Sequence, residues 1–124
     1  FDGGSDNPYL PRHHTPNQVV YTGTHDNDTT RSWFEGLTDD AKGEVYRQLG
    51  FPEVPMPEAL IQAALGSVAL LAILPVQDLL GLGSGYRMNT PGTTEGNWSF
   101  RCDRDAFTAE RLEAIASWVR ASGR

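Results

Sequence analysis

The sequence has little of several features that mark common classes of protein. Cys102 is the only cysteine and Lys42 the only lysine among 124 residues. A single cysteine excludes an internal disulfide and a cysteine-based zinc site, and it fits a reducing compartment. The net charge of −6 argues against a dedicated nucleic-acid-binding domain and against a polybasic membrane contact. No apolar run reaches the ~18 residues that a membrane-spanning helix needs.

What is present is typical of one globular domain. The chain is 39% hydrophobic and 21% charged, and a domain of this size can bury roughly two thirds of its unfolded surface. A soluble, intracellular protein is the default expectation. Because the sequence begins at Phe1 and not at a methionine, we expect either a processed chain or a piece of a longer one.

Alternating strand and helix patterns predict an α/β fold. The β-branched run 19–22 predicts a short strand, and the continuous apolar run 68–75 predicts a strand buried on both faces, as in a parallel sheet. Two strands cannot form such a sheet alone, so these patterns also predict part of a larger fold. The expected order is a loop at 1–17, a strand at 19–22, one or two helical turns at 29–35, helices at 38–50 and 57–66, a strand at 68–75, a glycine-rich loop at 81–96, an extended piece at 97–102 and a helix from 108.

Residue types at helix ends support these boundaries. Thr38 is expected to cap a helix that Gly50 closes, and Thr108 is expected to cap the last helix. Pro57 suits the first position of the helix that it opens. The last helix carries an apolar stripe of Leu112, Ile115, Ala116 and Val119.

The densest polar cluster, Thr24-His25-Asp26-Asn27-Asp28, directly follows the first predicted strand. A carboxylate beside an imidazole at this place can bind sugar hydroxyls, act as acid or base, or hold a metal ion. The alternative is structural, with Asp26 and Asp28 capping the following helix.

Three other features have weaker functional interpretations. Asp78 follows Gln77 past the second strand, and it could simply cap a turn at 79–80. His13-His14 could bind a metal, but adjacent histidines point in different directions and no third ligand is evident. The glycines at 81, 83 and 85 match neither a dinucleotide-binding fingerprint nor a P-loop.

Several long strings, in their order, resemble the amylomaltases, or 4-α-glucanotransferases. The strings are 1–11 (FDGGSDNPYLP), 19–29 (VVYTGTHDNDT), 75–83 (PVQDLLGLG), 87–93 (RMNTPGT) and 96–98 (GNW). The similarity runs from Phe1 to about Arg101, and together the strings are far more specific than one short motif. Arg12-His13-His14 and Phe100 depart from the family's pattern.

The resemblance implies a fold in the α/β class, the C-terminal portion of a (β/α)8 TIM barrel. Residues 1–124 would belong to the catalytic barrel domain, with no separate second domain, and would supply its last two strands with their helices and loops. The partners would be the remainder of the same barrel, malto-oligosaccharides, and starch- or glycogen-like glucans. Nucleic acid and membrane are not expected partners, and the implied location is cytoplasmic.

The resemblance also implies retaining transfer of α-1,4-glucan segments to a sugar 4-hydroxyl. Asp26 would be the catalytic carboxylate that stabilises the transition state, while the nucleophile and the acid/base carboxyl would lie upstream of this chain. His25, Asn27 and Asn97 would bind substrate. No cofactor and no metal ion is implied. Because the nucleophile and the acid/base carboxyl would lie outside it, the isolated chain is expected to be inactive.

Two other functions remain open. The first is a non-catalytic carbohydrate-binding or interaction module that uses the same strings. The second is a metal-dependent phosphohydrolase built on His25-Asp26, for which only His13 and His14 could supply further histidines.

Overall fold

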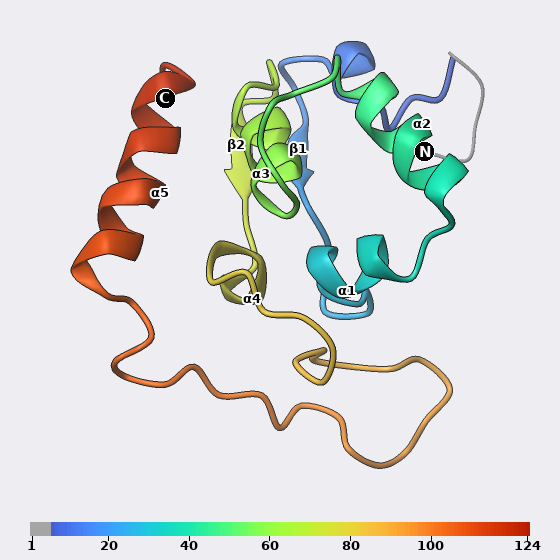
Figure 1. The fold of residues 1–124 in the computed structure, drawn as a ribbon, viewed down its shortest axis with the longest axis vertical. Helices are drawn as coiled ribbons and strands as arrows, with labels where there is room; N and C mark the ends of the chain where they lie inside the picture. Colours follow the sequence, from blue (N-terminus) through green and yellow to red (C-terminus); the bar gives the residue numbers. More distant parts are fainter. Residues whose placement is uncertain (1–5) are drawn as a thin grey trace.

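A computed structural model describes residues 6–124, as a two-stranded sheet with helices around it (Figure 1). The first five residues of the loop predicted at 1–17 lie outside the described residues. The elements are η1 (Pro11–His13), β1 (Val19–Tyr21), α1 (Thr30–Glu35), α2 (Asp39–Gln48), α3 (Glu58–Leu65), β2 (Leu71–Ile73), α4 (Val76–Leu79) and α5 (Ala109–Ala121). This order confirms the α/β prediction, although η1 and α4 were not expected as separate elements, and no strand forms at 97–102.

The two strands pair in parallel, with Val19 opposite Leu71 and Tyr21 opposite Ile73. The connection between them contains α1, α2 and α3, which makes a crossover of the kind found in parallel sheets. Both strands point toward the same end of the molecule, where α1 and α4 follow them (Figure 1). The side chains that follow both strands are therefore brought to one edge.

One face of this sheet is packed and the other is open. Val20 of β1 packs with Ala64 of α3 and with Ala69, and Ala72 and Leu74 pack against them. On the opposite face the exposed fractions are 49–53%, for Val19, Tyr21, Leu71 and Ile73. The prediction that the strand at 68–75 is buried on both faces is therefore wrong within this chain, because successive side chains alternate between the faces and α3 covers only one.

The helix boundaries follow capping chemistry. The hydroxyls of Thr29, Thr38 and Thr108 each accept a hydrogen bond from a backbone N–H in the first turn, which confirms the caps at Thr38 and Thr108. Gly50 ends α2 with a φ of +79°, a conformation that favours glycine. Pro57 is the residue before α3 and not its first helical residue.

Helix α5 lies beside the sheet as the least buried of the longer elements (Figure 1). The predicted stripe is only partly covered, since Leu112 is 52% exposed. Two polar contacts hold the helix: Trp118 Nε1 donates to Glu58 Oε1 at 3.0 Å, and the guanidinium of Arg124 donates to the backbone carbonyls of Leu65, Ser67 and Ala69 at 2.7–2.9 Å. The first bond joins α5 to the start of α3, and the bonds of Arg124 join the segment after α5 to the end of α3 and the turn that follows it.

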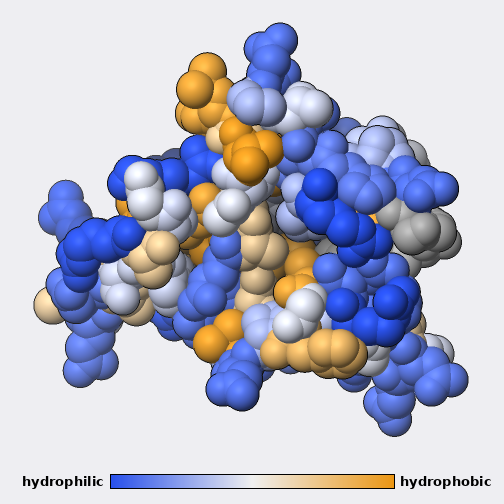
Figure 2. All heavy atoms as spheres, turned by 90° about the horizontal axis from the view of Figure 1, so that it is seen from above, coloured by the Kyte–Doolittle hydropathy of each residue, from blue (hydrophilic) through white to orange (hydrophobic). Residues whose placement is uncertain are grey.

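The surface is mixed in character. Figure 2 views the molecule from the end where the strands begin. Apolar areas lie near the middle and at one edge of this face, and hydrophilic areas surround them. Large exposed hydrophobic residues include Val68 and Leu70, at 60% and 82%. Of the helices in residues 6–124, none is long and apolar enough to cross a membrane.

Candidate active-site loop

The polar cluster at 24–28 lies at the end toward which β1 and β2 point, as the sequence predicted. It continues directly from β1 into α1, and the long loop between α4 and α5 passes beneath it (Figure 1). Carboxyl ends of parallel strands are where α/β proteins place their ligands. The strands therefore carry His25 and Asp26 to the expected edge.

Asp26 presents an exposed, braced carboxylate. Its side chain is 49% exposed, and His25 Nε2 lies 3.3 Å from Oδ1. Asn89 Nδ2 donates to the same oxygen at 2.7 Å. Among residues 6–124, none hydrogen-bonds to Oδ2. One oxygen is thus held from two sides while the other faces solvent.

The ring of His25 lies against the indole of Trp98, with 5.0 Å between the ring centroids and 38° between the planes. Trp98 is 62% exposed and has a φ of +58°, a conformation that costs a residue with a side chain roughly 1 kcal/mol or more. Its backbone N–H donates to the Met88 carbonyl at 2.7 Å. An imidazole, a carboxylate and an exposed aromatic ring are groups that recognise a sugar, through its hydroxyls and its C–H face.

The two asparagines predicted to bind substrate make internal contacts. Asn27 Oδ1 accepts hydrogen bonds from the backbone N–H and the hydroxyl of Thr24, at 2.8 and 3.0 Å. Asn97 Oδ1 accepts from the Thr90 N–H at 2.9 Å, while its amide donates to the carbonyl and hydroxyl of Thr93. Each asparagine shapes the loop that carries it, beside His25-Asp26 or Trp98.

The capping alternative is wrong for both aspartates, because Thr29 is the residue that caps α1, although Asp28 lies next to it and contacts the first turn. Asp28 Oδ1 accepts from the Thr29 N–H at 2.8 Å, and its Oδ2 accepts from the Ser32 hydroxyl at 2.7 Å. Both bonds stabilise the start of α1. Asp26 makes no such contact with α1 among the described hydrogen bonds, and its carboxylate faces the loop of Asn89 instead.

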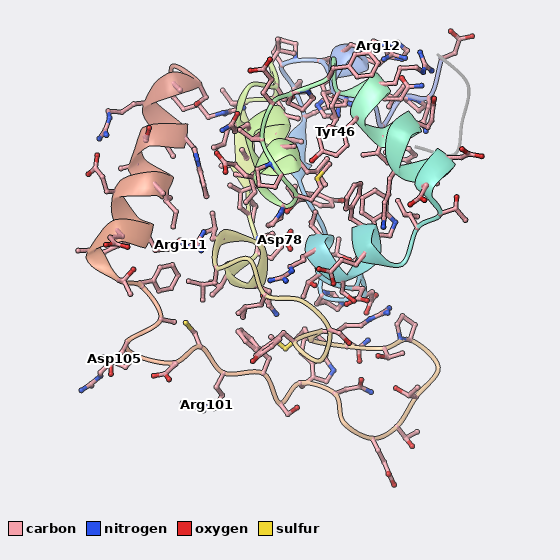
Figure 3. All side chains as sticks on the ribbon, in the orientation of Figure 1. Arg12, Tyr46, Asp78, Arg101, Asp105 and Arg111 are labelled. Carbon is pink, nitrogen blue, oxygen red and sulfur yellow. The ribbon has the colours of Figure 1, made fainter. Side chains whose placement is uncertain are left out.

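Asp78 has a role that the sequence did not indicate. It is a residue of α4, is 3% exposed and lies near the centre of the molecule (Figure 3). Its carboxylate accepts hydrogen bonds from the Thr22 hydroxyl at 2.5 Å, the Thr30 N–H at 2.8 Å and the Thr30 hydroxyl at 2.7 Å. The expected cap of a turn at 79–80 is wrong, because Asp78 instead joins β1 to the first residue of α1.

A hollow of about 190 Å³ lies between the two strand ends, beside this cluster. Its lining comes from the segment after β1, the segment after β2 and the α4–α5 loop. The lining residues are Gly23, Thr24, His25, Asp28, Thr29, Pro75, Gln77, Asp78 and Met88. This hollow adjoins the groups that could bind a sugar.

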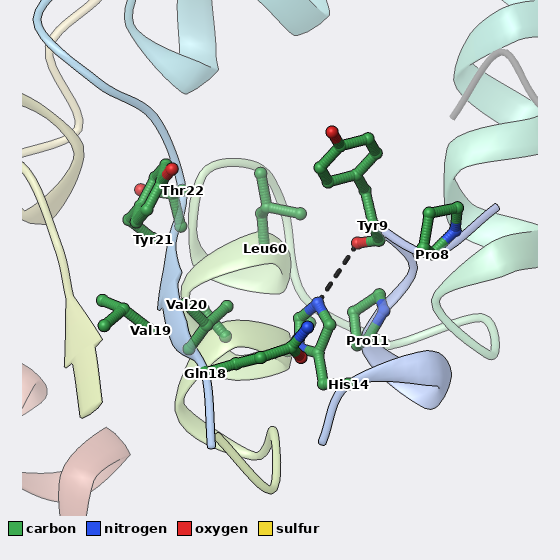
Figure 4. Close-up of a pocket in the computed structure, with 12 residues that line it drawn as sticks. Pro8, Tyr9, Pro11, His14, Gln18, Val19, Val20, Tyr21, Thr22 and Leu60 are labelled. Carbon is green, nitrogen blue, oxygen red and sulfur yellow. Dashed lines mark hydrogen bonds between the residues drawn. The ribbon is translucent and has the colours of Figure 1, made fainter. Parts of the chain in front are cut away.

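A larger hollow of about 370 Å³ has a different character (Figure 4). It lies between the loop before β1, β1 itself and α3, and its one imidazole is engaged. His14 Nε2 lies 3.3 Å from the Tyr9 carbonyl, so it must carry the proton, and Nδ1 then accepts from the Ser67 hydroxyl at 2.6 Å. In the part of the chain that the structure describes, no three histidine, cysteine, aspartate or glutamate residues gather to hold a metal ion.

Sequence reasoning missed Arg87 and Asn89 as members of the site. Arg87 donates to the Asp26 carbonyl at 2.6 Å and to the Asn89 carbonyl at 2.8 Å, and the Asn89 N–H donates to the His25 carbonyl at 3.0 Å. Both residues lie in the string 87–93 that carries the family resemblance. The string indicates the family, but it does not indicate that Arg87 and Asn89 contact the segment of His25 and Asp26.

Comparison with known proteins identifies the family of this chain. The model of the family described as 4-alpha-glucanotransferase matches residues 1–106. The chloroplastic/amyloplastic 4-alpha-glucanotransferase of Solanum tuberosum is 51% identical over 121 residues, covering 97% of this chain and 21% of that protein. The 4-alpha-glucanotransferase of Thermus thermophilus is 46% identical over 127 residues, covering 94% and 25%.

A solved structure gives the same result. The amylomaltase from Streptococcus agalactiae, in complex with acarbose, matches with a TM-score of 0.89 and 30% identity, over 96% of this chain and 24% of that one. The chain thus spans between about a fifth and a quarter of the length of the relatives compared. These matches agree with the motifs and the fold, and they show that the chain belongs to the 4-alpha-glucanotransferase family.

Proposed function

We propose that the chain is part of a 4-α-glucanotransferase, forming the C-terminal portion of its (β/α)8 catalytic barrel. The observation that carries this proposal is the carboxylate of Asp26, braced on Oδ1 and exposed on Oδ2 at the carboxyl end of β1. Membership of the family and the match to an amylomaltase support the reaction class. The substrates are α-1,4-glucans such as malto-oligosaccharides.

The reaction proceeds by two displacements. A carboxylate outside this chain attacks C1 of the donor sugar, the C1–O4 bond breaks, and an acid/base carboxyl, also outside this chain, gives its proton to the leaving O4. In the second step the acceptor's 4-hydroxyl gives its proton to that acid/base and attacks C1, which releases the enzyme carboxylate. Positive charge develops between C1 and the ring oxygen each time, and the negative charge of Asp26 stabilises it.

The neighbouring residues bind the same sugar. The imidazole of His25 contacts donor hydroxyls, while the adjoining indole of Trp98 offers an exposed ring face. The side-chain oxygen of Asn27 is engaged with Thr24, and in this proposal its NH₂ group donates to a sugar hydroxyl. The amide of Asn97 is engaged with Thr90 and Thr93, which leaves a lone pair of Oδ1 for substrate.

The open face of the sheet supports the barrel assignment. Four large apolar side chains on β1 and β2 are about half exposed on this face, and burying each would stabilise the fold by roughly 1 kcal/mol or more. In the proposed barrel this face points to the interior, where side chains from the other strands cover it.

The decisive experiment replaces Asp26 in the complete protein. Asp26→Asn keeps the shape and removes the charge, so kcat should fall by at least ~10²-fold, about 2.7 kcal/mol, while substrate binding weakens much less. Asp105→Asn, on an exposed turn of the α4–α5 loop, is the matched control and should retain turnover. Near-normal turnover of D26N would refute the assignment. Glucan binding without turnover by the complete wild-type protein would favour the non-catalytic binding module.

A further inference from the structure

The α4–α5 loop reaches back across the chain to contact Asp26. Arg87 and Asn89 are 61 and 63 residues away from it in sequence, yet three hydrogen bonds join 87–89 to 25–26. Two of them hold the backbone: Asn89 N–H to the His25 carbonyl, and Arg87 to the Asp26 carbonyl. The third, from Asn89 Nδ2, holds the carboxylate itself.

The bond to the carboxylate fixes its rotation. The terminal torsion of an aspartate is broad and roughly two-fold, so a free carboxylate at the surface turns readily. An N–H donor at 2.7 Å from Oδ1 selects one orientation, and the charge on the acceptor makes this bond stronger than a neutral one. Oδ2 accepts no hydrogen bond from residues 6–124, and the side chain as a whole is 49% exposed, so this oxygen remains free to interact with a sugar.

The donor is itself held in place. The Asn89 N–H and carbonyl are both hydrogen-bonded, to His25 and Arg87, at 3.0 and 2.8 Å. The next residue back, Met88, accepts the N–H of Trp98 through its carbonyl at 2.7 Å. One short stretch of loop therefore braces Asp26 and positions the indole that lies against His25.

We propose that Asn89 is a positioning residue of the transferase: its side-chain amide holds Oδ1 of Asp26 so that Oδ2 is presented to the donor sugar. This inference rests on the proposed function, because Asn89 can affect turnover in this way only if the charge of Asp26 stabilises the transition state. A carboxylate stabilises a transition state only in the right orientation. If that orientation is lost, kcat falls even though the charge remains.

The test is a double-mutant cycle in the complete protein, with maltotriose as substrate. Asn89→Leu keeps the size of the side chain and removes the donor. We expect kcat to fall about 10- to 30-fold with KM changed less than about 3-fold, since the lost bond of about 1.5–2 kcal/mol acts mainly on the transition state. In the D26N background the same substitution should change kcat by less than about 3-fold.

Two further variants distinguish a loss of activity through misfolding from a loss of activity through poor positioning of Asp26. Asn89→Gln restores an amide donor on a longer side chain, and it should recover at least about 3-fold of the kcat lost in N89L. Asp103→Ala removes an exposed carboxylate of the same loop, which accepts a hydrogen bond from the Asp105 N–H, and it should leave kcat within about 3-fold of wild type. Thermal melting of each variant reports whether the protein is folded.

Each outcome has a definite meaning. Equal losses from N89L in the wild-type and D26N backgrounds would show that Asn89 acts elsewhere, and a rise in KM without a fall in kcat would make it a substrate-binding residue. Either result overturns the positioning role, as does a folded N89L with normal turnover. If D26N loses activity in those experiments, the proposed function still stands; if D26N itself is fully active, both fail.

Discussion

The carboxylate of Asp78 accepts two hydrogen bonds from Thr30, one from the backbone N–H at 2.8 Å and one from the hydroxyl at 2.7 Å. Both residues are 3% exposed. A third bond comes from the hydroxyl of Thr22, at the end of β1. The segment that carries His25 and Asp26 thus starts and ends at residues held by one buried carboxylate, which closes the loop at its base.

Replacing Asp78 should therefore cost both stability and turnover. Thr30 is the first residue of α1, and its N–H has no partner within the helix. In Asp78→Ala this buried donor loses its acceptor, so we expect the free energy of unfolding of the complete protein to fall by about 2–4 kcal/mol. Urea denaturation measures this change. Asp78→Asn, which can still accept from the Thr30 N–H, should lose less.

The control for this variant is an aspartate of the exposed α4–α5 loop. Asp105 lies far from the centre of the molecule in Figure 3 and is exposed, so Asp105→Ala should change the free energy of unfolding by less than about 0.5 kcal/mol. Equal stability of D78A and D105A would show that the bonds to Thr22 and Thr30 contribute nothing.

A second prediction concerns helix α2 in acid. Hydrogen bonds from Arg47 and Gln48 lower the pKa of Glu44 from 4.5 to about 2. Because the folded pKa is the lower one, the unfolded chain binds more protons between these values, and the stabilisation is complete above pH 4.5 and lost as the pH falls toward 2. Thermal melts from pH 6 to pH 2.5 should show a smaller acid loss for Glu44→Gln than for wild type.

The effect of Glu44 should be small, because the pair is open to solvent and salt screens it. Glu53→Gln serves as the comparison, since Glu53 is an exposed residue in a turn outside the helices. The same acid loss in E44Q and wild type would mean that the ion pair with Arg47 does not stabilise the folded chain.

The sequence predicted the elements whose signals are local. Caps need only a threonine and the next turn, so Thr38 and Thr108 were recognised. The strand at 68–75 was overestimated, since a run of apolar residues does not show which of them pair: Val68 and Leu70 are exposed, and only Leu71–Ile73 form the strand.

Contacts between distant segments were not predictable in this way. The bonds from Thr30 to Asp78 and from Asn89 to Asp26 join residues 48 and 63 positions apart. Neither partner has a local pattern that indicates the other, so the sequence alone favours a cap at Asp78 and indicates no role for Asn89. His25 and Asp26 are predicted as site residues because a strand end and a family motif coincide there.

A third prediction is that the 124-residue chain alone has no transferase activity. By the proposed mechanism it supplies the stabilising charge of Asp26 but neither the nucleophile nor the acid/base, and without them covalent transfer has no route. Purified chain incubated with maltotriose should yield no maltotetraose or longer products, whereas the complete protein should. Such products from chain that is free of contaminating enzyme would contradict the prediction.

The last prediction concerns the physical state of the isolated chain. The open face of the sheet exposes Leu71 and Ile73 to 51% and 53%, and both strands of a two-stranded sheet have an unpaired edge. Exposed edges and apolar faces favour association. We therefore expect either self-association or a loosely packed, marginally stable monomer, with the capped helices α2 and α5 retained as local structure.

Size-exclusion chromatography with light scattering, together with a thermal melt, measures both properties. Leu71→Ser with Ile73→Thr should reduce association, because it makes the open face polar without changing the packed face at Ala72. Leu112→Ser removes a leucine of similar exposure, 52%, from α5 instead of the sheet, and it should reduce association less. A strict monomer with a sharp cooperative transition would mean that the chain closes its own core, and the self-contained binding module would then be the better explanation.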